Sequence, residues 1–291
     1  MTRGVVVGGG YTIIETMIFL AITGFLFVAA ITAVSGRQAT VQFAQGTRDM
    51  QADIERIINQ VSTGYYPGGN LVCTVGAGAA SPPVISTGAD QQGSSNNCVF
   101  IGKALQLGTA PDHNHYNAIS LAARRTTVSA SGKIQEVSSL KEAIPTAVTG
   151  RNDTYTLNYG LAVTKVYISG SPATYGSIVF LSTLPKFEGA TGTLASGAQR
   201  VSFGAIPGTT LDDDDSQVTA KVSNITDPTD STPGIRTPIV VNPITGIVIC
   251  VADDKDPARI TRRATITIGA GASQASAVLK TIVPGEVTEC P

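Results

Sequence analysis

The chain has 291 residues, of which 42% are hydrophobic and 14% charged, and its formal net charge at pH 7 is −1. This apolar content is enough for a folded core, which excludes global disorder. The small net charge leaves no basic footprint for nucleic acid or an anionic membrane surface at the level of the whole chain. The chain has only two histidines, so a metal centre built from several histidines is not expected.

The N-terminal 36 residues combine a short leader with an apolar run. Residues 1–10 read MTRGVVVGGG, in which Arg3 is the one charged residue. Residues 16–36 carry no charge. As a helix that rises about 1.5 Å per residue, this run is long enough to cross a hydrocarbon core of roughly 30 Å. The sequence therefore predicts a leader over residues 1–10 and a membrane-spanning helix over residues 11–36.

One carboxylate, that of Glu15, lies near the start of this apolar run. A carboxylate in hydrocarbon costs about 2–3 kcal/mol on the insertion scale, so an ionisable residue there indicates a function and needs a partner. Cleavage after Gly10 would make Tyr11 the N-terminal residue, four positions before Glu15. In a staggered bundle of such helices, Glu15 of one copy would pair with the α-amine of its neighbour.

The residues from Gly10 to Glu15, G-Y-T-I-I-E, and the apolar run after them resemble the N-terminal signal of type IV pilins and pseudopilins. The resemblance covers residues 4–36. It implies that a prepilin peptidase cuts after Gly10 and methylates Tyr11, and that Glu15 acts in assembly. Thr32 stands where many major pilins have proline, which favours a minor pilin or a pseudopilin.

Three other interpretations compete for the same segment. A secretory signal peptide could be cut near Ala33, Val34 and Ser35, but Arg3 alone makes a weak positive region and Glu15 would interrupt its apolar core. An uncut anchor would hold an extracellular domain at the membrane without polymerising. A buried core helix is disfavoured because few globular helices are apolar on every face.

Residues 37–63 predict an amphipathic continuation of the same helix. Apolar side chains recur at spacings of three, four and seven residues, at Phe43, Met50, Ile54, Ile57, Ile58 and Val61. We expect this apolar stripe to pack on the head of the protein and not to bind a ligand. One helix is therefore predicted from about residue 11 to about residue 62.

Residues 64–291 are expected to form an extracellular, strand-rich head, which makes the fold class α+β with antiparallel strands. Residues 64–98 carry almost no charge and are predicted to be a loop. Residues 185–235 are either an insertion or part of one elaborated sheet. Strands are predicted where β-branched residues lie between glycine or proline clusters, at 118–123, 155–158, 162–168, 177–182, 239–241, 247–252, 264–268 and 277–282.

The four cysteines, Cys73, Cys98, Cys250 and Cys290, form no C-x-x-C motif and allow three pairings. Proximity in the sequence favours Cys73–Cys98 and Cys250–Cys290. Two disulfides would suit an oxidising compartment. The alternative is four buried free thiols.

Two acidic segments are candidates for Ca²⁺ because hard cations need clustered oxygen ligands. No EF-hand spacing is present, so a solvated acidic loop is the simpler interpretation. The carboxylates concerned are residues 212–215, Asp227, Asp230, Asp253, Asp254 and Asp256.

Two further clusters have a functional and a structural interpretation. Arg259, Arg262 and Arg263 could contact DNA phosphates, or lie on an outward strand face balanced by nearby aspartates. His113 and His115 could form a metal or acid–base site, or a polar turn. No catalytic motif occurs, so neither an enzyme nor a resident cofactor is expected.

These features predict a type IV filament subunit, with a minor subunit favoured. Its expected partners are prepilin peptidase, other pilin subunits, the inner-membrane assembly machinery and the lipid bilayer. The N-terminus would lie on the inner side of the cytoplasmic membrane and the head on the outer side. The protein would then assemble into an extracellular pilus or pseudopilus. The alternative is a membrane-anchored extracellular binding or adhesion protein that does not polymerise.

Overall fold

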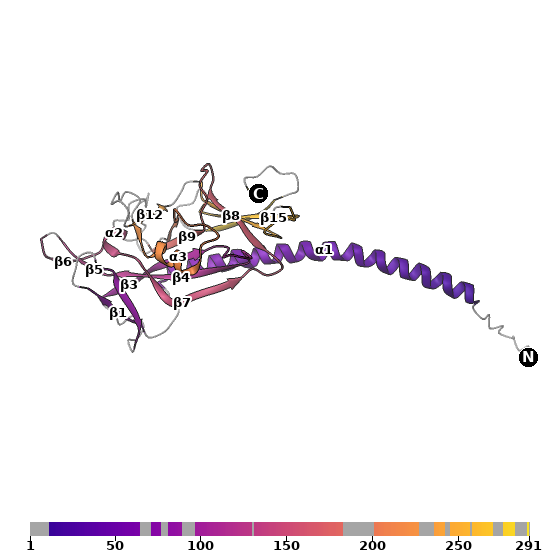
Figure 1. The fold of residues 1–291 in the computed structure, drawn as a ribbon, viewed down its shortest axis with the longest axis horizontal. Coiled ribbons are helices and arrows are strands. Elements are labelled where there is room, and N and C mark those ends of the chain that lie inside the picture. The colour runs from indigo at the N-terminus through magenta and orange to yellow at the C-terminus, as the bar shows by residue number, and fades with distance from the viewer. Residues whose placement is uncertain are drawn as a thin grey trace, which may run out of the picture. The chain divides into compact units, whose positions relative to one another are not determined.

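The computed structural model describes residues 12–64, 71–76, 81–88, 97–129, 131–182, 201–226, 236–241, 245–256, 258–269, 276–282 and 290 (Figure 1). The chain divides into two compact units, Met1–Ala44 and Gln45–Pro291. Helix α1, Ile13–Ser62, continues from the first unit into the second. The second unit, which we call the head, therefore contains residues 45–62 of α1 together with the strands.

Besides α1, the described residues form two short helices, α2 (Leu140–Ala143) and α3 (Asp215–Val222), and sixteen strands. The strands are β1 (Leu71–Val75), β2 (Pro83–Thr87), β3 (Cys98–Gln106), β4 (His115–Arg124), β5 (Thr126–Val128), β6 (Ile134–Glu136), β7 (Thr146–Thr156), β8 (Ala162–Ile168), β9 (Ser177–Ser182), β10 (Val201–Ala205), β11 (Ile225–Thr226), β12 (Thr237–Pro238), β13 (Val240–Val241), β14 (Ile247–Ala252), β15 (Arg263–Ile268) and β16 (Ala277–Ile282).

Both ends of α1 are set by local backbone chemistry. Thr12 Oγ1 accepts a hydrogen bond from the backbone N–H of Glu15 at 3.3 Å, which satisfies one of the amides that a helix start leaves unpaired. At the other end Gly64 has a φ of 65° and donates its N–H to the carbonyl of Val61. Glycine adopts this left-handed ending without strain. The bounds of α1 agree closely with the helix predicted from the sequence.

The centre of the head is a six-stranded antiparallel sheet with the strand order β13-β10-β9-β3-β4-β7. A second antiparallel sheet has the order β16-β15-β14-β8. Two hairpins, β1–β2 and β5–β6, and a short parallel pair, β11–β12, complete the described strands. The head is therefore strand-rich and mostly antiparallel, and the α+β class is confirmed.

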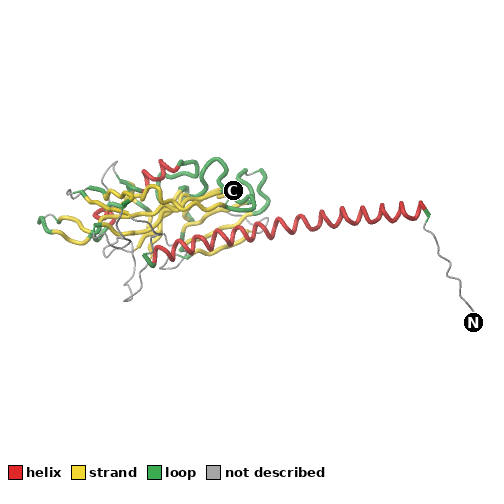
Figure 2. Tube along the Cα trace, turned by 90° about the horizontal axis from the view of Figure 1, so that it is seen from below, coloured by secondary structure: helices red, strands yellow, loops and turns green. Residues whose placement is uncertain are grey.

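Successive residues of β4 bond to helices on opposite faces of the six-stranded sheet. The hydroxyl of Tyr116 donates to Asp53 of α1 at 3.2 Å, and Asn117 Nδ2 donates to Asp215 of α3 at 2.9 Å. Neighbouring side chains of a strand point to opposite faces, so α1 and α3 cover the two sides. Figure 2 shows the strands of the head between these helices. Coverage of both faces agrees with the burial of eight of the ten residues of β4.

The predicted apolar stripe of α1 is buried within the head. The side chains of Met50, Ile54, Ile57 and Val61 are at most 1% exposed, and Ile58 is 7% exposed. Full burial of a side chain of this size contributes roughly 1.5–3 kcal/mol. This part of α1 is therefore held mainly by apolar packing, as the spacing of these residues predicts.

Polar and aromatic contacts also join α1 to the sheet. The rings of Tyr116 and Tyr155 stack with their centroids 5.0 Å apart, and the Arg56 guanidinium lies 5.3 Å from the Tyr155 centroid. Arg56 also pairs with Asp53 at 2.9 Å. Burial and the neighbouring Asp53 carboxylate raise the pKa of Tyr116, which keeps its hydroxyl protonated as a donor. These contacts connect α1 to β4 and β7.

The opposite face of the sheet packs against α2 and α3. Ile119 and Leu121 of β4 join a buried apolar cluster with residues of β3, β9 and both short helices. The cluster comprises Ile101, Ala104, Ile119, Leu121, Ala123, Val137, Leu140, Ala143, Ala147, Val179, Leu181, Ile206, Val218, Val222, Ile225 and Ile239. The six-stranded sheet therefore has an apolar core on each side.

One expectation for the head needs correction, and one open alternative finds support. The segment over residues 64–98 is not simply a loop, because β1 and β2 pair there along five positions. Of the two alternatives for residues 185–235, the elaborated sheet is supported, because β10 pairs with β9 inside the six-stranded sheet. β1 and β2 are themselves rich in β-branched residues, but the glycine, serine and asparagine residues around them mask this signal.

A lysine lies fully buried in the sheet. The Lys103 side chain on β3 has no exposed surface, and its Nζ lies 2.8 Å from Oδ2 of Asp153 on β7. The Asp153 side chain is 41% exposed. Because β4 lies between these two strands, the pair spans a neighbouring strand and places the compensating carboxylate near water. A buried ammonium is tolerable only with such a partner.

We predict that Asp153→Ala lowers the free energy of unfolding by about 3 kcal/mol, because it leaves a buried ammonium uncompensated. The Lys103→Met/Asp153→Ala variant should recover most of this loss, since it also removes the charge. Denaturant titration of the full chain in detergent measures both. A double variant as unstable as Asp153→Ala would contradict this account of the pair.

Candidate functional site

The candidate processing and assembly site lies at the N-terminus. Gly10 and Tyr11, and the leader over residues 1–10, lie outside the residues that the structure describes. Glu15 is described and is an exposed residue of the first turn of α1. The structure therefore places one of the three predicted site residues.

Glu15 has a structural partner that the sequence analysis missed. Its backbone N–H donates to Thr12 Oγ1, so Thr12 is the N-cap of α1. The spacing Thr-x-x-Glu is typical of a capping box, and this signal is visible in the sequence. A carboxylate in the first turn also faces the positive end of the helix dipole. The backbone of Glu15 is thus fixed, while no cationic side chain pairs with its carboxylate within the described residues.

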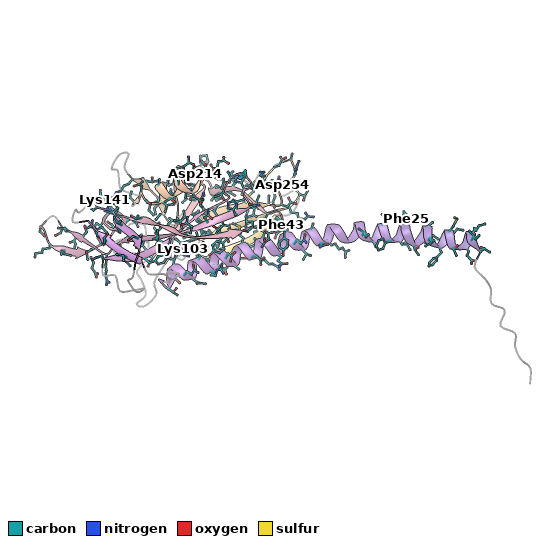
Figure 3. All side chains as sticks on the ribbon, turned by 60° about the horizontal axis from the view of Figure 1, so that its bottom comes forward. Phe25, Phe43, Lys103, Lys141, Asp214 and Asp254 are labelled. Atoms are coloured by element: carbon teal, nitrogen blue, oxygen red, sulfur yellow. A yellow bond between two sulfur atoms is a disulfide. The ribbon has the colours of Figure 1, made fainter. Side chains whose placement is uncertain are left out.

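The helix after Thr12 presents apolar side chains on all sides. Every residue from 12 to 31 is exposed, and Figure 3 shows Phe25 on this part of α1. The segment Ile13–Ile31 is long and apolar enough to cross a membrane, a test that an N-terminal signal sequence also passes. Thr16 and Thr23 donate their hydroxyls to backbone carbonyls of Ile13 and Phe19, each at 2.8 Å. Their hydroxyls therefore need no partner outside the helix.

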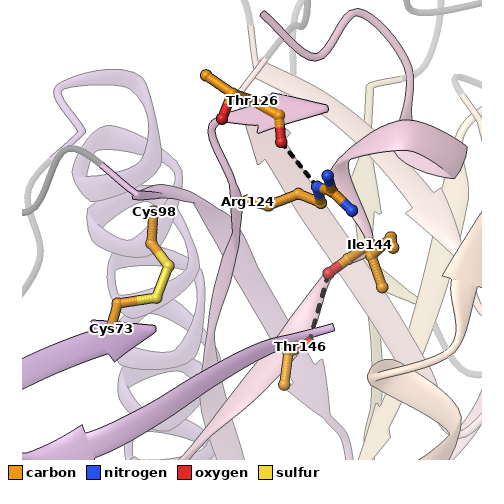
Figure 4. The surroundings of a disulfide bond; sticks show 6 residues. All are labelled: Cys73, Cys98, Arg124, Thr126, Ile144 and Thr146. Atoms are coloured by element: carbon orange, nitrogen blue, oxygen red, sulfur yellow. Dashed lines mark hydrogen bonds between the residues drawn. A yellow bond between two sulfur atoms is a disulfide. The ribbon is translucent and has the colours of Figure 1, made fainter. Parts of the chain in front are cut away.

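The predicted disulfide pairing is confirmed. Cys73 of β1 bonds to Cys98 at the start of β3 (Figure 4), and Cys250 of β14 bonds to Cys290 near the C-terminus. No cysteine is left free. The first disulfide ties the β1–β2 hairpin to the six-stranded sheet, and the second ties the chain end to the four-stranded sheet. Both are typical of a protein that folds in an oxidising compartment.

We predict that Cys73→Ser/Cys98→Ser lowers the free energy of unfolding by about 3 kcal/mol, because the unfolded chain regains the entropy of the opened loop. Cys250→Ser/Cys290→Ser, which opens the longer loop, should be at least as destabilising. Thermal unfolding of oxidised wild type and both variants provides the measurement. Unchanged melting temperatures would show that the bonds do not stabilise the head.

The aspartates at residues 212–215 build the start of α3. Asp214 is its N-cap and forms a capping box with Gln217, with hydrogen bonds of 2.8 and 3.0 Å. Asp213 pairs with Lys221 at 2.7 Å, and Asp215 accepts from Asn117. These carboxylates are therefore held by protein donors.

The aspartates before β15 shape a tight loop. Asp253 accepts from the backbone N–H groups of Thr261 and Arg262 and pairs with the Arg262 guanidinium at 3.1 Å. Asp254 accepts from the backbone of Asp256. Figure 3 shows Asp254 well apart from Asp214. No group of three metal-ligating side chains occurs among the described residues, and Asp227 and Asp230 lie outside them.

The loop around Asp253 should make stability depend on pH. Burial opposes ionisation, but hydrogen bonds from Thr261 and Arg262 outweigh it and lower the pKa of Asp253 below its usual 3.8. A depressed pKa gives stability that is fully present above the unfolded pKa and is lost as pH falls through the folded one.

We therefore predict that Asp253→Asn lowers the melting temperature at pH 7. Relative to this variant, the wild type should lose its advantage as pH falls below about 4, the region of the unfolded pKa. Melting curves at a series of pH values measure the difference. A constant difference down to the lowest pH would contradict a role for this carboxylate.

The arginine cluster is partly neutralised by the chain itself. Arg262 pairs with Asp253, and Arg259 lies 3.6 Å from Asp256. These contacts favour the local charge balance that was the alternative to a DNA-binding patch.

The two histidines have different partners. His113 Nδ1 lies 2.5 Å from the carbonyl of Gly108, and its Nε2 lies 3.7 Å from Asp212. His115 Nδ1 lies 3.1 Å from the side-chain oxygen of Asn114. These bonds fit the polar-turn interpretation of the segment.

Comparison with known proteins shows that no protein-family model, no curated protein and no solved structure matches this chain. The resemblance to type IV pilins therefore rests on residues 4–36 alone.

Proposed function

We propose that this protein is a subunit of a type IV filament, a pilin or pseudopilin with a minor role favoured. The observation that carries the proposal is one carboxylate, Glu15, at the start of an exposed apolar helix and five residues after Gly10. A membrane anchor alone needs no such group, and an ionisable residue at this depth indicates a partner.

The mechanism begins with insertion of α1 into the cytoplasmic membrane, with the N-terminus inside and the head outside. Prepilin peptidase then cuts after Gly10, and Tyr11 becomes the methylated N-terminal residue. Thr12 lies on the mature side of the cut, so processing leaves the cap of α1 intact. The helix therefore needs no refolding at its new terminus.

Processing also creates the positive charge that the Glu15 carboxylate needs as a partner. The new α-amine adds a positive charge at the positive end of the helix dipole, which is unfavourable within one subunit. In a staggered neighbour this amine can meet the Glu15 carboxylate, and both buried charges are then compensated. Before processing this amine does not exist, so assembly would follow cleavage.

The other features of the chain support an exported head. Two disulfides suit folding outside the cytoplasm. Small side chains such as Ala21, Gly24 and Ala29 allow apolar helices to approach closely in a bundle. The bilayer, other subunits and the inner-membrane assembly machinery are the partners that this function implies. We do not propose DNA or Ca²⁺ as a ligand.

A second candidate function is a membrane-anchored binding or adhesion protein that never polymerises. The apolar segment Ile13–Ile31 and the disulfides support it equally well. The two functions differ in what they require of Glu15, because only the filament uses its carboxylate.

We predict that Glu15→Ala is inserted and processed normally but lowers the amount of filament at least about tenfold, which corresponds to the loss of one compensated charge pair. Glu15→Asp should retain part of the wild-type level, and Thr23→Ala is the matched control on the same helix. Sheared filaments are quantified against total membrane-bound protein. Normal filaments from Glu15→Ala would exclude the pairing, and wild-type cells without filaments would favour the second candidate.

A further inference from the structure

The part of α1 inside the head has an exposed stripe that none of the described strands covers. Gln45, Arg48, Ala52, Glu55 and Asn59 are all exposed and follow one another at alternating spacings of three and four residues. We call this set the outer stripe. A repeat of three and four keeps one face of a helix turned toward a neighbouring helix over several turns.

The outer stripe lies on the other side of α1 from the residues that pack on the sheet. Met50, Ile54, Ile57 and Val61 are buried at the intervening positions with the same spacing. One helix therefore carries two parallel stripes, one used within the head and one available to a partner. The outer stripe is polar, so its partner must present matching charges.

The outer stripe carries one positive side chain, Arg48, and one negative side chain, Glu55, which can pair only between two copies of the chain. Arg48 forms no ion pair within the described chain, and the Glu55 carboxylate accepts a hydrogen bond from Gln51 at 3.0 Å. Arg48 and Glu55 are seven residues apart, or about 10.5 Å along the helix axis, which is too far for a direct pair within one helix. A parallel second helix shifted by two turns would bring them face to face.

We infer that the outer stripe is a contact between copies of this chain, in which Glu55 of one subunit pairs with Arg48 of the next. This inference rests on the proposed filament function and adds a subunit register to it. The neighbour that supplies Arg48 is shifted toward the C-terminal end of the helix. An ion pair repeated at every subunit interface would fix that shift along the filament.

The N-terminal pairing requires a shift in the same direction. For the α-amine of Tyr11 to meet Glu15, the neighbour must also move toward the C-terminal end, because Tyr11 precedes Glu15 in the sequence. The two pairings therefore require shifts of the same sign.

The test is a charge exchange in the full chain, expressed in cells that assemble filaments. Arg48→Glu and Glu55→Arg should each lower the yield of sheared filaments about tenfold, because each places like charges at the subunit contact. The Arg48→Glu/Glu55→Arg variant should return the yield to within about twofold of wild type, since the pair is restored in reverse. Lys133→Glu, an exposed change elsewhere on the head, is the control for altered net charge.

Three outcomes distinguish a contact between copies of this chain from a contact with a different protein or none. Normal yield from both single variants would overturn the inference and leave the proposed function standing. A low yield from both single variants that the double variant does not restore would assign the outer stripe to a contact with another protein. This result would also overturn the inference. Melting curves of the detergent-solubilised variants check that each head is folded. Failure of wild type to polymerise would instead count against the proposed function.

Discussion

The apolar start of α1 has to be covered, and this requirement governs the rest of the molecule. Every described side chain from Thr12 to Ile31 is exposed. At roughly 25 cal/mol per Å² of apolar surface, exposing a helix of this length to water is strongly unfavourable, which favours lipid or other apolar helices around it. Glu15 is the one ionisable side chain of Ile13–Ile31, so the surroundings of the helix decide whether its charge is compensated. Lipid would leave its carboxylate uncompensated, whereas the proposed bundle of processed subunits would supply an amine.

A head attached to such a helix must be stable by itself. The six-stranded sheet achieves this with a helix on each face, and β4 shows how, since Tyr116 and Asn117 bond to α1 and α3 in turn. Lys103, the buried lysine of this sheet, has the carboxylate of Asp153 as its partner. Two disulfides tie the β1–β2 hairpin to the six-stranded sheet and Cys290 to the four-stranded sheet. The outer stripe of α1 is exposed beside these contacts.

The sequence predicts the elements whose signals are local. The helix through residue 62 follows from apolar spacing, and the bounds of β8, β9, β14 and β16 coincide with the predicted ranges. Among the elements missed, β3 depends on distant partners. Lys103 and Gln106 interrupt the apolar pattern of β3, and their partners lie far along the chain in Asp153 and Asp213. In the sequence, the aspartates before α3 look like a solvated loop, because the role of Asp214 as the N-cap of α3 depends on where the helix begins. At the candidate site, the position of Glu15 follows from the sequence, but its cap by Thr12 was overlooked although the pattern is local.

The most direct test is the identity of the first residue of the mature protein. Intact mass and N-terminal sequencing of protein purified from membranes or filaments would determine it. We predict a chain that begins at Tyr11 with a methylated amine. A chain that retains Met1, or one that begins near Gly36, would contradict this prediction, because Glu15 would then have no new amine to meet.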